Sequence, residues 1–238
     1  MKQRGNSAKA RKWGPVLADI ASRLASLYGS PDLGNESDPV REIFYIALSA
    51  KTTERLYQRA YRRLWSRFRT VQGIASARRA SILDCVKCAG LGNKRASQVK
   101  MIAAQLVADF PINPSRELSA LPHERVFEYL INLPGVGPKS ALCIMMMSLD
   151  ADVFPVDVNV QRVAERIGII RAKLKHYQAQ KEMPPLVPAG ISRQLHVGMV
   201  VHGRTICLPQ RPKCRQCVLL DLCRYGKQRL EKDRAGPR

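Results

Sequence analysis

Apolar residues recur at helical spacing along most of this 238-residue chain, and no segment shows the strict apolar–polar alternation of a half-buried strand. The first helical pattern begins at Pro15 and ends at Gly29, with an apolar face formed by Val16, Leu17, Ile20, Leu24 and Leu27. Other helices are predicted to begin at Pro39, after Thr53 and at Pro138, to run over about 78–88, 94–109, 122–130 and 191–203, and to extend from Asp157 to Gly168. The pattern therefore predicts an all-α protein.

The charge of the chain indicates what it binds. Forty Lys and Arg residues against nineteen Asp and Glu give a formal net charge of +21, and the pI is about 10.2. Such an excess points first to nucleic acid, with an anionic membrane surface as the rival partner. No apolar run approaches the roughly 20 residues that span a bilayer, and the start, MKQRGNSAKARKWGP, has no hydrophobic signal region. We therefore expect a cytosolic or nucleoid-associated protein with no membrane segment.

Both ends of the chain are polar. Residues 1–13 carry five Lys and Arg residues and no acid, which is typical of a mobile basic arm or of a disordered terminus without a specific role. Residues 227–238 are predicted to form a loose charged tail.

The chain has seven cysteines, four of them within seventeen residues near the C-terminal end. These four are spaced C-x6-C-x2-C-x5-C: Cys207, Cys214, Cys217 and Cys223. Four thiolates in so short a loop can hold one metal centre, and both a [4Fe–4S] cluster and tetrahedral zinc accept four Cys ligands. The same loop carries three basic residues that could contact phosphate, namely Arg211, Lys213 and Arg215. The other cysteines, Cys85, Cys88 and Cys143, are predicted to pack in the core.

A short glycine-containing turn, LPGVG, joins two helical patterns at residues 133–137. Such a turn can present successive backbone N–H groups at the start of a helix, which is a site for an anion such as a nucleic-acid phosphate. The predicted contacts are Gly135, Val136 and Gly137. An ordinary connection between two helices is the alternative interpretation.

Lys139 follows in the first turn of the next helix, where the positive end of the helix dipole disfavours a cation. The lysine is either incidental and solvated, or its environment lowers its pKa and makes the amine a nucleophile. A carboxylate, Asp157, follows eighteen residues later. It could serve the same chemistry, although an Asp just before a helix is also a good N-cap.

Taken together, these motifs resemble the endonuclease III branch of the helix-hairpin-helix DNA glycosylases. The resemblance runs from about Pro39 to Tyr225 and rests on LPGVGPKSA, VDVNVQRV, the cysteine spacing, IALSAKTTE and GLGNKRA. It implies two all-α lobes flanking a DNA-binding cleft: a six-helix barrel with the helix-hairpin-helix motif and an iron–sulfur cluster lobe. The expected divisions are a basic disordered arm at 1–13, a helix at 14–29 packed with the cluster lobe, the barrel at 30–150, the cluster lobe at 151–226 and a charged tail at 227–238.

The resemblance also assigns roles to residues. Lys139 matches the nucleophilic lysine, Asp157 matches the essential aspartate, and the four clustered cysteines would hold a [4Fe–4S] cluster rather than zinc. Leu91 matches a leucine wedge that enters the duplex. Lys51 stands where the family has a glutamine that fills the space left by the flipped base, and Asn159 replaces a common histidine.

The activity implied is that of a bifunctional DNA glycosylase and AP lyase acting as a monomer on double-stranded DNA that contains a damaged base or an abasic site. Oxidised pyrimidines are the first expectation for the base removed. The alternatives are a lyase restricted to abasic sites, a monofunctional glycosylase for mismatched or oxidised purine bases, a non-catalytic DNA-binding iron–sulfur module and a zinc-stabilised adaptor.

Overall fold

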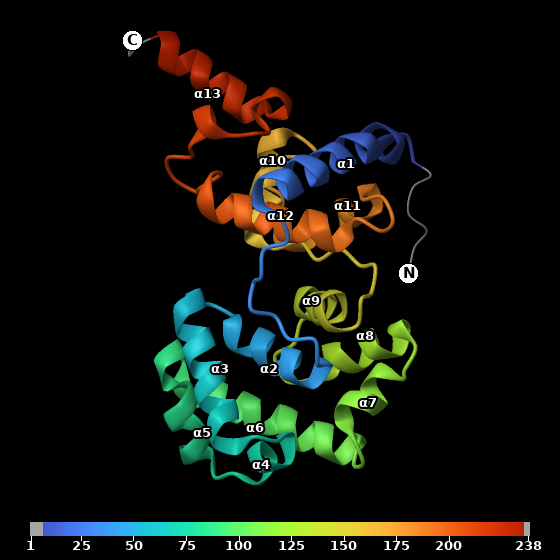
Figure 1. Cartoon of the computed structure of the whole chain (residues 1–238), viewed down its shortest axis with the longest axis vertical. Coiled ribbons are helices and arrows are strands. Elements are labelled where there is room, and N and C mark those ends of the chain that lie inside the picture. The colour runs from blue at the N-terminus through green and yellow to red at the C-terminus, as the bar shows by residue number, and fades with distance from the viewer. Residues whose placement is uncertain (1–6, 236–238) are drawn as a thin grey trace. The chain divides into compact units, whose positions relative to one another are not determined.

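The structure, a computed structural model, describes residues 7–235 and divides into two compact units (Figure 1). One unit is the continuous segment Gly34–Ala151. The other joins the residues up to Leu33 to those from Asp152 onward. The described residues form helices connected by turns and contain no strand, so the prediction of an all-α protein is confirmed. None of the helices in this part of the chain combines the length and apolar character needed to cross a membrane.

The Gly34–Ala151 unit is built around one buried helix. Its helices are α2 (Pro39–Ser49), α3 (Glu54–Phe68), α4 (Val71–Ser76), α5 (Arg79–Val86), α6 (Gly92–Asp109), α7 (Pro114–Ser119), α8 (His123–Asn132) and α9 (Pro138–Ser148). Helix α2 packs against α3, α6, α7 and α9, and it is buried on nearly every side (Figure 1). A helix that is apolar all round belongs in a core. Even Glu42 is fully buried there, and it accepts hydrogen bonds from Asn35 Nδ2 at 2.5 Å and the Glu36 N–H at 2.8 Å.

The second unit combines the two ends of the chain. Its helices are α1 (Ala8–Tyr28), α10 (Val158–Ile167), α11 (His176–Glu182), α12 (Ser192–Thr205) and α13 (Arg224–Ala235). Helix α1 packs against α12, and α10 packs against both α12 and α13. The crossing of α1 and α12 is close, since a Cβ built on Gly198 would lie 2.9 Å from the Cβ of Leu24.

Two predictions about the ends of the chain need correction. Helix α1 begins at Ala8, so residues 8–13 are helical and only residues 1–6 of the predicted arm lie outside the described residues. The Ser7 side chain caps this helix by accepting from the Ala10 N–H at 3.2 Å. Pro15 therefore lies inside a helix, and the residue before it is Gly14, whose missing Cβ removes the usual clash with the proline ring.

The predicted loose tail is also largely helical. Helix α13 covers Arg224–Ala235, which leaves only residues 236–238 of that tail outside the description. Its sequence is rich in Lys, Arg, Gln and Glu, which are good helix formers, and the Lys227 N–H donates to the Cys223 carbonyl at 3.1 Å. The helix is thus fixed to the cysteine segment at its start.

The helical spacing of apolar residues did not predict the short helices. Helices α7 and α11 are six and seven residues long, too short for a helical period to repeat. The predicted helix at 78–88 is α5 followed by a 3₁₀ turn at Lys87–Ala89. Helix α6 begins at Gly92, with Leu91 in the left-handed conformation as its N-cap.

Candidate active site and cysteine cluster

The LPGVG turn between α8 and α9 is held by its neighbours in the Gly34–Ala151 unit. Gln98, on α6, donates from Nε2 to the Pro134 carbonyl at 2.9 Å. Gly135 has φ of 72°, and a Cβ there would lie 2.5 Å from Gln98 Nε2. Both the backbone conformation and the space therefore require glycine at this position.

Packing does not explain the glycine at position 137, because no described residue lies beside it. Its φ is −91°, and a Cβ added there would meet nothing within 4 Å. Gly137 is the N-cap of α9 and supplies no side-chain hydrogen bond to the first turn. Gly135 and Gly137 are both exposed, so the start of α9 is accessible to a ligand.

Val136 does not fit the predicted DNA contact. Its side chain is 4% exposed, and its N–H already donates to the Leu133 carbonyl at 3.1 Å. The turn therefore presents its two glycines outward and directs the residue between them into the core.

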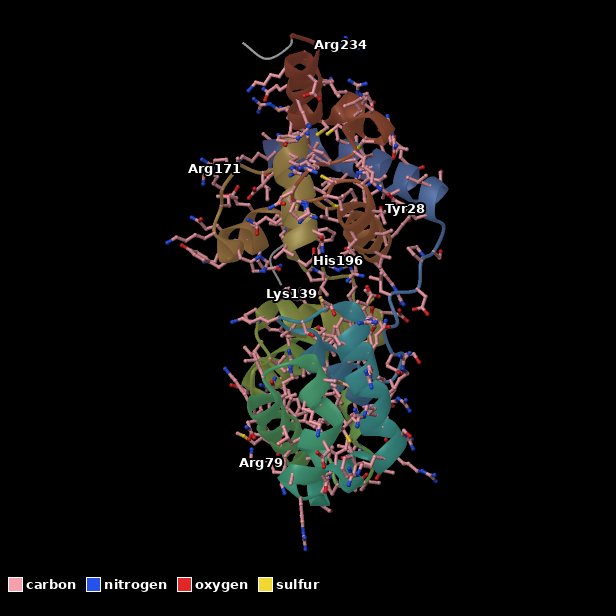
Figure 2. The ribbon with its side chains drawn as sticks, turned by 90° about the vertical axis from the view of Figure 1, so that its left-hand side faces the viewer. Tyr28, Arg79, Lys139, Arg171, His196 and Arg234 are labelled. Atoms are coloured by element: carbon pink, nitrogen blue, oxygen red, sulfur yellow. The ribbon has the colours of Figure 1, made fainter. Side chains whose placement is uncertain are left out.

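Lys139 lies in the first turn of α9, directly after Pro138 at N1 (Figure 2). The residue is half-buried, while the rest of the helix is anchored by buried Ala141, Cys143 and Ile144. Because α9 packs against α2 and α8, the lysine extends from a rigid support. It belongs to the Gly34–Ala151 unit, whereas Asp157 belongs to the other.

Asp157 is the N-cap of α10. Its Oδ1 accepts from the backbone N–H of Asn159 at 2.8 Å and of Val160 at 2.7 Å. Its Oδ2 accepts from Asn159 Nδ2 at 3.0 Å, and Asn159 Oδ1 accepts in turn from Arg162 Nη2 at 2.8 Å. These bonds fix the orientation of the carboxylate and of the Asn159 amide.

Arg162 extends this network to the cysteine segment. It donates from Nη2 to the Gly203 carbonyl at 2.7 Å and from Nε to the Cys207 carbonyl at 2.8 Å. Burial lowers the pKa of this guanidinium from its usual value. Nothing in the residue spacing predicts these contacts, because the partners lie more than forty positions apart.

The predicted duplex contacts Lys51 and Leu91 are both exposed and both have a left-handed backbone, with φ of 53° and 51°. Leu91 exposes 59% of its surface, which is unusual for a leucine. Lys51 lies just after α2, and Leu91 lies just before α6. The exposure of Leu91 is therefore compatible with the prediction that this side chain enters the duplex.

The four clustered cysteines line a single cavity together with apolar side chains. The remaining lining residues are Arg166, Ile206, Pro212, Leu220, Tyr225 and Gly226. Two donors point at the sulfurs: Arg166 Nη1 lies 3.3 Å from Cys207 Sγ, and the Gly226 N–H lies 3.3 Å from Cys223 Sγ. His202 Nε2 also lies 3.4 Å from Cys217 Sγ. Donors of this kind suit sulfur ligands that carry negative charge.

Burial raises the pKa of Cys217 to about 11 and also raises the pKa of Cys214 and Cys223, with a further contribution from neighbouring thiols. A metal would reverse this preference, because metal ligation deprotonates a thiol. In the described part of the chain, no three His, Cys, Asp or Glu side chains are grouped so as to hold a single metal ion. The four thiols and the apolar side chains around them are nevertheless the residues of this segment that could hold a metal centre.

His202, on α12, is a contact that the sequence did not reveal. Its ring is 1% exposed, and burial lowers its pKa to about 4. Nδ1 lies 3.0 Å from the Tyr28 hydroxyl, while Nε2 faces Cys217 Sγ. A neutral ring that accepts from Tyr28 would donate its one proton to the sulfur.

The three basic residues predicted to contact phosphate are exposed on the same segment. Arg211 has φ of 49° and precedes buried Pro212, Lys213 follows, and Arg215 lies in the 3₁₀ turn Cys214–Gln216. The cysteine segment therefore presents a row of cations outward and its sulfurs inward.

The chain is similar in sequence and fold to known proteins. Residues 45–188 match the HhH-GPD superfamily of base excision DNA repair proteins. Endonuclease III of Thermotoga maritima is 27% identical over 90% of this chain and 95% of its own length. Among solved structures, a non-covalent Endonuclease III–DNA complex superposes with a TM-score of 0.79 at 24% identity, over 91% of this chain and 98% of that one. A thermostable thymine-DNA glycosylase gives 0.76 at 24% identity, over 92% and 98%.

The endonuclease III resemblance predicted from the sequence is thereby confirmed. The superfamily match spans more than half of the chain and includes the Gly-x-Gly turn, Lys139 and Asp157, while the relative from Thermotoga maritima extends the likeness to most of the remaining residues. The all-α fold of the described residues agrees with both solved structures. This protein belongs to the HhH-GPD superfamily of base excision DNA repair proteins.

Proposed function

We propose that this protein is a bifunctional DNA glycosylase and AP lyase in which Lys139 is the nucleophile. The observation that carries the proposal is the position of Lys139 in the first turn of α9, behind a cap residue that leaves the start of the helix open. A core helix could begin with any capping side chain. A cap glycine beside which no described residue packs, with a half-buried lysine two residues further on, suits a site that must admit a ligand.

The start of α9 would bind a phosphate of the damaged strand. The first N–H groups of a helix have no partner within the helix, and together with the helix dipole they favour an anion. Gly137 leaves room for the phosphate to approach, and Gly135 gives the turn its shape. Binding here would bring the sugar of the same nucleotide toward Lys139.

The reaction proposed for Lys139 has two steps. After the damaged nucleotide leaves the stack, the neutral amine attacks C1′, a C–N bond forms, and the glycosidic bond breaks with its electron pair leaving on the base, which is then protonated. Ring opening gives a Schiff base between Nζ and C1′. Loss of a C2′ proton then expels the 3′ phosphate by β-elimination, and the strand is nicked 3′ to the lesion.

Asp157 would stabilise the positive charge that develops on the sugar as the glycosidic bond breaks. A negative charge at the start of α10 is favoured by the helix dipole, and three hydrogen bonds fix its position. Because Oδ1 accepts both backbone bonds, Oδ2 is the oxygen that would face the sugar. Asn159 donates a hydrogen bond to that oxygen and would restrict rotation of the carboxylate.

The substrate proposed is duplex DNA carrying an oxidised pyrimidine, acted on by a monomer at the nucleoid. Lys51 replaces a glutamine expected beside the flipped base, and its exposed side chain adds a cation there. That change favours, as the second candidate, an enzyme restricted to abasic sites, because an abasic site needs no base pocket.

We also propose that Cys207, Cys214, Cys217 and Cys223 hold a [4Fe–4S] cluster. The support is their shared cavity, the two N–H donors aimed at their sulfurs and the His202 ring beside Cys217. Bound there, the cluster would supply four strong metal–sulfur crosslinks within one segment. The exposed cations Arg211, Lys213 and Arg215 would then contact DNA phosphates from a rigid loop.

Replacing Lys139 by Gln should abolish covalent capture by borohydride while leaving DNA binding within about threefold, because the glutamine amide cannot form a Schiff base. The measurement is borohydride trapping on duplexes that contain thymine glycol, dihydrouracil, a mismatch or an abasic site. Lys94→Gln, on the exposed side of α6, is the matched control and should trap as the parent does.

The lesions that trap would rank the substrates. An adduct with thymine glycol or dihydrouracil supports the oxidised-pyrimidine enzyme, whereas an adduct with the abasic duplex alone supports the second candidate. Tight binding by the parent without any adduct would contradict both.

Asp157→Asn should lower the single-turnover rate of base release by about 10²–10³-fold, the usual effect of removing one electrostatic stabiliser. Asn is also a good N-cap, so we expect the free energy of unfolding to fall by less than about 1 kcal/mol. Urea unfolding separates the two effects. A rate loss that merely follows a large loss of stability would show that the carboxylate acts only as a cap.

The purified protein should contain iron and acid-labile sulfide in equal amounts, about four of each per chain, and should absorb visible light. Cys217→Ser should remove most of the iron. Cys88→Ser, a half-buried thiol of the other unit, should retain it. Stoichiometric zinc in a colourless parent protein would rule out the cluster.

A further inference from the structure

Arg95 is a buried cation of the Gly34–Ala151 unit, and the hydrogen bonds of its side chain all go to backbone carbonyls. Arg95 lies in the first turn of α6, and the residue is 4% exposed. Nε donates to the Gly90 carbonyl at 2.7 Å, and Nη1 donates to the Leu48 carbonyl at 2.8 Å. Nη1 also lies 3.4 Å from the Ala47 carbonyl, and Nη2 donates to the Ala50 carbonyl.

This burial has a cost that no ion pair offsets. None of the ion pairs found among the described residues includes Arg95, and burial lowers its pKa. The compensation comes from carbonyls at the end of α2, which carry the negative end of that helix dipole. A well-packed apolar residue often replaces a buried charge without loss of stability, so the guanidinium calls for another explanation.

Two of the carbonyls it binds explain the arrangement. Ala50 directly precedes Lys51, and Gly90 directly precedes Leu91. One planar guanidinium therefore holds the residue before each predicted duplex contact. Both contacts have a left-handed backbone, which is unfavourable for a residue other than glycine and persists only where the surroundings enforce it.

We propose that Arg95 is a positioning residue that joins the loops bearing Lys51 and Leu91 into one rigid element, so that the two side chains enter the duplex together at the lesion. This inference rests on the proposed function, because it concerns how that enzyme opens DNA. A side chain on a mobile loop would be displaced when it met the stacked bases. The guanidinium of Arg95 donates to both loops at once through separate nitrogens, which the single ammonium of a lysine cannot do.

The test is a double-substitution cycle on DNA opening. All chains carry Lys139→Gln, so that chemistry does not interfere, and the duplex carries 2-aminopurine beside a tetrahydrofuran abasic analogue. The rise in fluorescence reports unstacking. Affinity for this duplex, divided by affinity for the undamaged duplex, gives lesion discrimination.

We expect Leu91→Ala to reduce discrimination about tenfold and Arg95→Lys to reduce it about fivefold, both with a smaller fluorescence rise. The double variant should be no worse than Leu91→Ala alone, because residues that act as one unit are not additive. Lys100→Met is the matched control: Lys100 also extends from α6 to a carbonyl, that of Ala77 at 2.8 Å, yet it touches neither loop. It should keep the discrimination of the parent.

A merely structural role for Arg95 would lower the melting temperature without this coupling. If the two losses multiply in the double variant, or if Arg95→Lys keeps full discrimination, the inference is wrong. Should Arg95→Lys fail to fold, a cycle of Lys51→Ala and Leu91→Ala tests the same joint action on two exposed residues. Coupling of threefold or more is expected there, and independent effects would overturn the inference.

The proposed function is tested separately by borohydride trapping with intact Lys139. If the parent protein forms no adduct on any duplex, the proposed function is wrong. If the parent traps normally but the effects of Leu91→Ala and Arg95→Lys are independent, only the role inferred for Arg95 is wrong.

Discussion

The unpaired N–H groups at the start of a helix are the constraint on which this site depends. Helix α10 satisfies them with its own carboxylate, because Asp157 accepts from two backbone N–H groups. Helix α9 has no capping side chain, since Gly137 occupies the cap position, and none of the residues that the structure describes packs where its Cβ would be. One helix thus holds a fixed negative charge, and the other begins with an open anion site followed by an amine. The proposed function assigns the first to stabilising charge on the sugar and the second to the nucleophile.

Arginine side chains connect helix ends to irregular segments within each unit. Arg162 links the cap of α10 to the first cysteine of the cluster through the Cys207 carbonyl, and Arg166 donates to the sulfur of the same residue. Arg95 performs a similar connection in the other unit, between the end of α2 and the start of α6. In each case the guanidinium binds carbonyls that helices or turns leave exposed. Irregular segments of both units are therefore held by side chains that extend from helices.

Much of this could be predicted from the sequence, since a helical period shows wherever a helix is long enough to repeat it. Helices α2, α3, α6 and α12 follow their apolar patterns closely, whereas α7 and α11 are too short for one. The start of α1 was misplaced because Pro15 reads as a first residue, although Gly14 lets the helix pass through it. Lys139, Asp157 and the four cysteines could be singled out as candidates because each lies in a compact local motif.

The remaining features depend on contacts between distant positions. Arg95 reads as one more basic residue on a charged chain, and only the fold brings it to carbonyls more than forty positions away. His202 likewise meets Tyr28 from 174 positions along the chain. The Val136 N–H closes the turn by donating to the Leu133 carbonyl, a detail of backbone geometry that spacing does not encode.

The most direct test of the central claim is to locate the covalent attachment itself. The trapped protein–DNA adduct would be digested with nuclease and protease, and the modified peptide would be sequenced by mass spectrometry. The account predicts a reduced sugar remnant on Nζ of Lys139, in the peptide that contains the Gly-x-Gly turn. A remnant on another lysine or on the terminal amine would contradict it.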